Sequence, residues 1–430
     1  MSRDKKTTIT FHNGILTIGG TIIEVAYGDS HIFFDFGSEY HPADPIQPTD
    51  LQGLLDHKLI PYLDHIYDPA IPLKGYASKG EKFAHTAVFL SHVHLDHSKA
   101  INYLDPQIPL YTLEGTKSLL NTLNINDDFL FPLYGKHTKN TREIIGVKEY
   151  ETVVVGDIQV KVMPVDHDAY GACGLLIETP DKKIAYTGDI RLHGYREAAS
   201  LKFCEECKHA DVLLIEGVSV SFQELDEVKE SDEVSNEAAL IDVINKVVKE
   251  NPNKQITFNY YISNVERILK IIESCPRTVV LEDYYAYVVK EASGVNVHYY
   301  SLSGKDYGLD PQYKVEFNDL LADEGRFFWQ LERAALTYID QLKVGGIYIH
   351  SNAQPLGDYD PSYAPFMKAF ADHGIEVVIA SCSGHAHPHD LIKIIDLIEP
   401  KLLAPIHSLH PERLVNKAGD RLLPEKKQTI

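Results

Sequence analysis

The chain has 430 residues, which is enough for two to three domains that each bury a sizeable core. Its formal net charge of −21 disfavours a large basic nucleic-acid surface, although bound cations can reverse that charge locally. The longest apolar runs fall short of the roughly 20 residues that span a bilayer, the first residues are polar, and five cysteines do not make a disulfide scaffold, so we expect a cytoplasmic protein without a membrane partner.

The N-terminal third begins with alternating apolar residues that predict two strands, at 15–25 and 31–36. Residues 39–84 are rich in Pro, Asp and His and predict an insertion over the mouth of a site. A buried strand is then expected at 87–90, because four apolar residues follow one another there.

Directly after that strand, residues 92–97 have the sequence His-Val-His-Leu-Asp-His. His92 and His94 are two residues apart in an extended stretch, so both can point towards one ion. Asp96 and His97 are adjacent and diverge, which lets them reach a second ion. Imidazole and carboxylate together suit Zn²⁺ first, with Mn²⁺ or iron as alternatives.

Three further candidate ligands each lie at the end of a predicted strand. His167 ends the alternating stretch that starts at residue 158, Asp189 ends 183–189, and His407 ends 401–407. Strand ends that meet at one edge of a sheet predict two divalent-metal sites. One is formed by His92, His94 and His167, the other by Asp96, His97 and His407, and Asp189 bridges them.

Between Asp189 and His407 the pattern changes to alternating strands and helices, which predicts an α/β unit with a mainly parallel sheet. We expect domain segments at 1–216, 217–365 and 366–430, the second inserted into the first. Ser263 is a candidate helix cap, and residues 317–342 are expected to be partly helical. Cys204 and Cys207 form a lone CxxC pair, for which a helix is favoured over a metal site.

These residues together resemble the metallo-β-lactamase superfamily, whose fold is an αββα sandwich, and Asp35 resembles its supporting aspartate. The inserted unit resembles the β-CASP group of nucleic-acid-processing enzymes, through Glu216, Ser263-Asn-x-x-Arg267, Ser383-Gly-His385-Ala and Pro405-Ile-His407. The last two motifs are most similar to ribonuclease J. The sequence ends at Ile430, so we expect the C-terminal domain of typical ribonuclease J to be missing.

The resemblance implies hydrolysis of RNA by a hydroxide shared between two metal ions. Asp96 would bind metal and orient the hydroxide, His385 would contact the scissile phosphate, and Glu216 would orient a metal-binding histidine. Ser383, Ser263 and His350 are candidate substrate contacts, with a plain helix cap as the alternative for Ser263. Single-stranded RNA, including 5′-phosphorylated RNA, is the expected partner, and a homodimer is expected from the family.

The sequence leaves three alternatives open. A DNA nuclease of the same fold would differ only in groove shape and in contacts to the 2′-hydroxyl. A hydrolase of small esters or thioesters would suit the strong acidity, and a non-catalytic protein would not need the complete ligand set. The sequence also leaves open whether cleavage proceeds from an end or internally.

Overall fold

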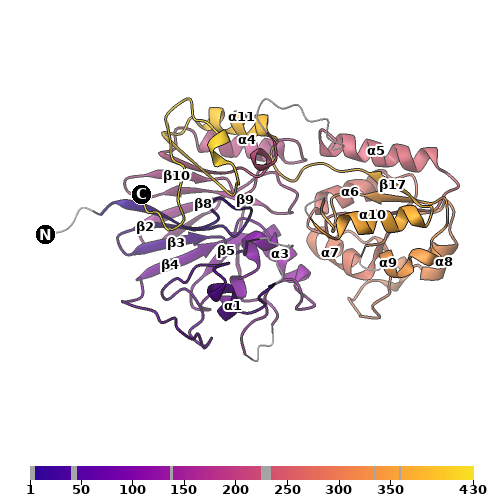
Figure 1. Cartoon of the computed structure of the whole chain (residues 1–430), viewed down its shortest axis with the longest axis horizontal. Coiled ribbons are helices and arrows are strands. Elements are labelled where there is room, and N and C mark those ends of the chain that lie inside the picture. The colour runs from indigo at the N-terminus through magenta and orange to yellow at the C-terminus, as the bar shows by residue number, and fades with distance from the viewer. Residues whose placement is uncertain (1–4, 40–45, 136–138, 224–233, 333–334, 358–359) are drawn as a thin grey trace. The chain divides into compact units, whose positions relative to one another are not determined.

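The computed structural model describes residues 5–39, 46–135, 139–223, 234–332, 335–357 and 360–430 (Figure 1). The chain forms two compact units. Unit 1 comprises Met1–Leu192, Arg196–Lys229 and Gly384–Ile430, and unit 2 comprises His193–Tyr195 and Glu230–Ser383. Unit 2 is therefore inserted between two parts of unit 1, and its last residue is 383, where the sequence analysis placed a boundary at 365.

Unit 1 contains two mixed β-sheets. The first has the strand order β1-β2-β3-β4-β5-β6, antiparallel from β1 to β3 and parallel from β3 to β6. Its strands are β1 (Thr7–Asn13), β2 (Ile22–Tyr27), β3 (Ser30–Phe34), β4 (His85–Phe89), β5 (Leu110–Leu113) and β6 (Ile145–Val147).

The second sheet has the order β19-β18-β11-β10-β9-β8-β7, with the pairs from β10 to β19 parallel and the others antiparallel. Its strands are β7 (Thr152–Val155), β8 (Ile158–Pro164), β9 (Cys173–Glu178), β10 (Lys183–Tyr186), β11 (Val212–Glu216), β18 (Leu402–Ile406) and β19 (Asp420–Arg421). Because β18 joins a sheet built mostly from earlier strands, the last part of the chain completes this unit.

The two sheets pack face to face over one hydrophobic core. Buried residues such as Phe11 and Phe89 of the first sheet and Ile177 and Leu214 of the second belong to the same cluster. Helices cover the outer faces, which gives the predicted αββα sandwich (Figure 1). The helices of this unit are α1 (Leu51–Asp56), α2 (Leu95–Ser98), α3 (Glu114–Leu123), α4 (Glu197–Glu206) and α11 (Pro388–Ile398).

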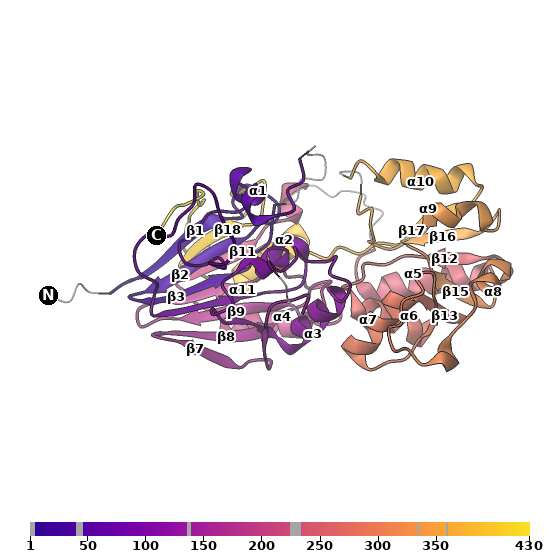
Figure 2. The same cartoon turned by 90° about the horizontal axis from the view of Figure 1, so that it is seen from below.

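Unit 2 contains an all-parallel sheet with the order β14-β13-β15-β12-β16-β17. Helices α9 and α10 lie on one face of it, and α6 and α7 lie on the other (Figure 2). The strands are β12 (Ile256–Phe258), β13 (Thr278–Glu282), β14 (His298–Tyr300), β15 (Phe327–Gln330), β16 (Ile347–His350) and β17 (Glu376–Ile379). The helices are α5 (Glu237–Glu250), α6 (Val265–Ser274), α7 (Asp283–Ser293), α8 (Phe317–Ala322), α9 (Ala335–Tyr338) and α10 (Tyr363–Asp372). The predicted fold class is confirmed.

Local predictions were wrong in two places. The strand expected at 15–25 begins only at Ile22. Gly14, Gly19 and Gly20 have positive φ, which is incompatible with an extended strand in the connection between β1 and β2. The stretch expected to be partly helical contains α8 and α9, as predicted, and also the central strand β15, whose Trp329 is fully buried. The cap of α6 is Asn264, whose side chain accepts from the backbone N–H of Arg267, rather than Ser263. No helix in the described part of the chain is long and apolar enough to cross a membrane.

Candidate metal centre

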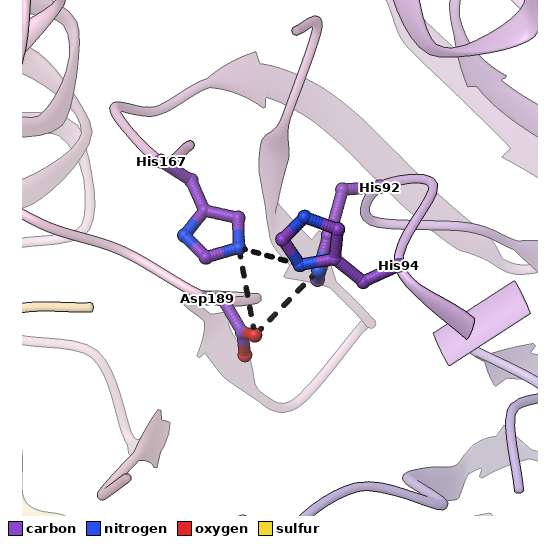
Figure 3. A group of neighbouring side chains, drawn as sticks. All are labelled: His92, His94, His167 and Asp189. Carbon is purple, nitrogen blue, oxygen red and sulfur yellow. Dashed lines mark hydrogen bonds and ion pairs between the residues drawn. The ribbon is translucent and has the colours of Figure 1, made fainter. Parts of the chain in front are cut away.

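Seven side chains from four separate segments of unit 1 form two adjoining groups of metal-ligand type. In the first group, the ligand atoms of His92, His94, His167 and Asp189 all lie within 4.8 Å of one another (Figure 3). The second group consists of Asp96, His97 and His407, within the same limit. We call these groups site A and site B. The two groups contain the seven residues that the sequence predicted as ligands, with the predicted bridging residue Asp189 counted in site A.

Asp189 lies between the two sites. Its Oδ2 is 3.5 Å from Nε2 of His92 in site A and 3.3 Å from Nε2 of His97 in site B. Its Oδ1 is 3.9 Å from Nδ1 of His407. One carboxylate thus faces imidazoles of both groups, which is the geometry that a bridging ligand requires.

Four of the atoms that face the centre are buried and have no hydrogen-bond partner among the described residues. They are Nε2 of His92, His97 and His407, and Oδ1 of Asp189. Buried polar atoms are nearly always paired, so four unpaired atoms that converge need a ligand of their own. Imidazole nitrogens with carboxylates form the donor set that divalent cations such as Zn²⁺ bind, so these residues fit a pair of metal ions.

Burial keeps most of these imidazoles in the neutral form that binds metal. It holds the pKa of His92 well below the ordinary value, and it lowers the pKa of His167 to about 3 despite the nearby Asp168. Burial likewise lowers the pKa of His94 and His407. His97 is the exception, because Asp189, Asp96 and Asp35 outweigh its burial and raise its pKa well above the usual range.

The outer nitrogens of the imidazoles are held by the protein. Nδ1 of His97 lies 2.9 Å from Oδ2 of Asp35, which is the supporting position predicted for that aspartate. Nδ1 of His167 donates to the carbonyl oxygen of Gly384 at 2.6 Å, and Nδ1 of His92 lies 2.9 Å from Oγ of Ser91. Such outer contacts fix the ring orientation and the tautomer of a metal-binding histidine.

Asp35 is itself held by residues that the sequence analysis did not single out. Its carboxylate accepts from the backbone N–H of Ser91 at 2.8 Å, from Oγ of Ser91 at 3.0 Å and from the hydroxyl of Tyr186. Both Asp35 and His407 have backbone conformations that non-glycine residues rarely adopt, with φ of 60° and 49°. Strained backbone of this kind concentrates at functional sites, where surrounding contacts sustain it.

Glu216 lies at the end of β11 and is almost fully buried. Its Oε1 is 3.1 Å from Nδ1 of His385, and its Oε2 accepts from the backbone N–H of Val218 at 2.8 Å. The sequence predicted that Glu216 orients a metal-binding histidine, whereas the imidazole it holds is that of His385, outside both metal groups. Burial lowers the pKa of His385, but Glu216 and Asp189 outweigh it and raise this pKa to about 10.

The remaining candidates lie in unit 2. His350 ends β16, and its Nδ1 is 3.0 Å from Nδ2 of Asn259. Ser263 is buried beside the cap of α6, and the carbonyl oxygen of Ser383 accepts from Nε2 of His193 at 2.9 Å. Their roles as substrate contacts stay predictions.

Comparison with known proteins places this geometry in a family. The model of the β-lactamase superfamily domain matches residues 76–241. Ribonuclease J of Mycoplasma genitalium is 21% identical over 94% of this chain and 68% of its own length. An RNase J-like protein of Methanocaldococcus jannaschii is 28% identical over 50% of each chain. A crystal structure of a protein of unknown function from Enterococcus faecalis V583 is 49% identical, covers 99% of both chains and has a TM-score of 0.93.

Residues 76–241 form a domain of the metallo-β-lactamase superfamily. Relatives that match over most of the chain are named ribonuclease J, and together with that domain they support a metal-dependent hydrolase. The family explains why the ligands come from strand ends, since the two sheets of the sandwich bring those ends to one edge. Cys204 and Cys207, by contrast, are free thiols on or beside α4, and burial raises the pKa of Cys204 to about 12.

Proposed function

We propose that this protein hydrolyses phosphodiester bonds in RNA, using a pair of divalent metal ions held by sites A and B. The observation that carries the proposal is the pair of adjoining ligand groups with Asp189 between them and buried unpaired atoms turned inwards. The relatives named ribonuclease J, which match over 94% and 93% of this chain, support RNA as the substrate.

When bound, two such ions supply an activated water at neutral pH and polarise a phosphoryl oxygen. The residues of this chain then have distinct tasks. His92, His94 and His167 hold one ion, and Asp96, His97 and His407 hold the other. Zn²⁺ fits this set best, with Mn²⁺ as the alternative. Asp96, which is the most exposed of the seven ligands at 22% of its side chain, orients the attacking water.

His385 is proposed to act on the scissile phosphate and on the leaving group. Oε1 of Glu216 lies 3.1 Å from Nδ1 of His385, which favours the protonated form of the imidazole and holds the ring in place. A cation in this place stabilises the charge that develops on the scissile phosphate and can give its proton to the departing 3′ oxygen. Ser383, which precedes Gly384 and His385 in the chain, is proposed to bind phosphate, and Ser263 and His350 of unit 2 to contact the RNA.

The test compares 5′-phosphorylated single-stranded RNA, DNA of the same sequence and an ester substrate. The wild type is assayed beside the variant Asp96→Ala/His97→Ala and the control His209→Ala, which removes a histidine that is 66% exposed. We expect RNA degradation by the wild type and the control, and its loss in the double variant. Cleavage of DNA alone would identify a DNA nuclease, and cleavage of the ester without nucleic acid would identify a small-molecule hydrolase. Either result would overturn the proposal.

The length distribution of the products separates the two modes of cleavage that the proposal leaves open. Release of mononucleotides from the first time points indicates an exonuclease, and labelling of one end gives its direction. Fragments of intermediate length indicate an endonuclease. The homodimer expected from the family stays a prediction, which sedimentation of the purified protein tests.

A further inference from the structure

A carboxylate outside the predicted ligand set lies against site A. Asp168 follows His167 in the loop after β8, and its side chain is 11% exposed. Its Oδ1 is 3.3 Å from Nε2 of His167 and 3.6 Å from Nε2 of His94. It does not belong to the group whose ligand atoms all lie within 4.8 Å of one another. Asp168 therefore lies beside the imidazoles of both His167 and His94 without being one of the four ligands of site A.

The two imidazoles beside Asp168 turn different ring nitrogens towards the centre of site A. His167 uses Nδ1 for its hydrogen bond to Gly384, so its Nε2 faces the centre of the site. That Nε2 lies 3.1 Å from Nδ1 of His94. His94 consequently presents Nδ1 to the site, and its Nε2 is the outer nitrogen. A neutral imidazole that binds metal through one nitrogen carries its proton on the other.

We propose that the negative charge of Asp168, whose Oδ1 lies 3.6 Å from Nε2 of His94, favours the tautomer of His94 that carries its proton on Nε2 and offers Nδ1 to the metal of site A. The inference rests on the proposed metal pair. In site A, Ser91 lies beside the outer nitrogen of His92 and Gly384 accepts from that of His167, so Asp168 completes the same support for the third imidazole. Asp168 is thus a positioning residue.

Gly384 packs directly against the carboxylate of Asp168. A Cβ atom at residue 384 would lie 2.5 Å from Cγ and from Oδ1 of Asp168, which is closer than real contacts allow. The carboxylate therefore occupies the space that any side chain at 384 would need. Because residue 384 is a glycine, its carbonyl oxygen can accept from His167 while the carboxylate of Asp168 keeps its place beside His94.

The experiment measures the affinity for Zn²⁺ in the absence of RNA. The metal-free full-length protein is titrated with Zn²⁺ against a chromophoric chelator, which gives separate dissociation constants for the two equivalents. The variants are Asp168→Ala, which removes the carboxylate, and Asp168→Asn, which keeps an oxygen of the same reach. The control is Asp181→Asn, which removes one exposed carboxylate on the turn between β9 and β10.

We expect Asp168→Ala to weaken one equivalent by about 10-fold to 100-fold, the usual effect of removing an outer partner of a metal-binding histidine. The second equivalent and the control stay at the wild-type values, and Asp168→Asn recovers part of the lost affinity. Circular dichroism of the metal-free variants checks that they fold.

Two results would overturn the inference. Wild-type affinity of both equivalents in Asp168→Ala would mean that His94 needs no support, and loss of a whole equivalent in both Asp168 variants would make Asp168 a direct ligand. If the wild type binds two equivalents but cleaves no RNA, the proposed function fails while this inference stands. A wild type that binds fewer than two equivalents would contradict both.

Discussion

The ion pair between Arg267 and Glu237 is expected to hold unit 2 together. Both residues are buried, with Arg267 at 0% and Glu237 at 1% exposure. Nε and Nη2 of the guanidinium donate to the two carboxylate oxygens of Glu237 at 2.9 and 2.8 Å. Nη1 donates to Oδ1 of Asn352 at 2.8 Å and Nη2 to the carbonyl oxygen of Cys382 at 3.2 Å. One side chain thus ties α5, α6 and two later loops of the unit to each other.

The substitution Arg267→Met removes the cation and leaves the carboxylate of Glu237 buried. Breaking a buried pair from one side costs about 3–5 kcal/mol, because the remaining charge keeps its desolvation penalty. In urea, with a slope of about 2 kcal/mol per molar, that cost lowers the unfolding midpoint by about 2 M. The double variant Glu237→Leu/Arg267→Met removes the stranded charge as well, so it is expected to recover part of the loss.

The assay uses the single tryptophan of the chain, Trp329, which is buried in β15. Its fluorescence in urea reports the unfolding of unit 2 alone, so changes in unit 1 do not obscure the result. The control Arg326→Met removes an exposed arginine of the same unit and should change the stability by no more than about 1 kcal/mol. A midpoint for Arg267→Met within the range of the control would refute the reasoning.

Three further predictions concern unit 1. Hydrogen bonds from His12 and His31 outweigh the burial of Glu24 and lower its pKa from 4.5 to about 2. The contribution of Glu24 to the stability of the folded protein is therefore complete above pH 4.5 and is lost as the pH falls through 2. Glu24→Gln should therefore cost about 3 kcal/mol at pH 7 and nothing below pH 2, as measured by urea unfolding at each pH, and an equal loss at both would contradict the linkage. Chelation of divalent metals should abolish RNA cleavage and lower the melting temperature, with both restored by Zn²⁺ or Mn²⁺, whereas activity that survives chelation would contradict a metal centre. Asp35→Asn should weaken metal binding by about 10-fold to 100-fold in a chelator titration, because His97 loses its anionic partner, and unchanged affinity would exclude that role.

The sequence by itself marked the candidate ligands. Each of them follows a short apolar strand, and the alternation of side chains along a strand decides locally which residues point out of its end. The cluster at 92–97 and the three distant segments that end at His167, Asp189 and His407 could therefore be assigned to two groups, and the structure brings the same residues together. The inserted parallel sheet followed from the alternation of strands and helices, whereas the αββα sandwich was implied by the resemblance of these motifs to the metallo-β-lactamase superfamily.

Only the tertiary structure decided which polar side chains meet. Glu216 is level with Ile406 in the pairing of β11 with β18, yet its carboxylate holds His385, which comes from the loop before α11. Likewise, Arg267 belongs to the Ser-Asn-x-x-Arg motif that resembles the β-CASP group, yet its side chain donates to Glu237. Asp168 lies against His94, and no spacing in the sequence marks it as part of the site. Contacts of this kind depend on how sheets and loops pack over long chain separations, and no local periodicity encodes them. The nitrogen that each imidazole turns inwards is decided in the same way, by the outer partner that packing supplies.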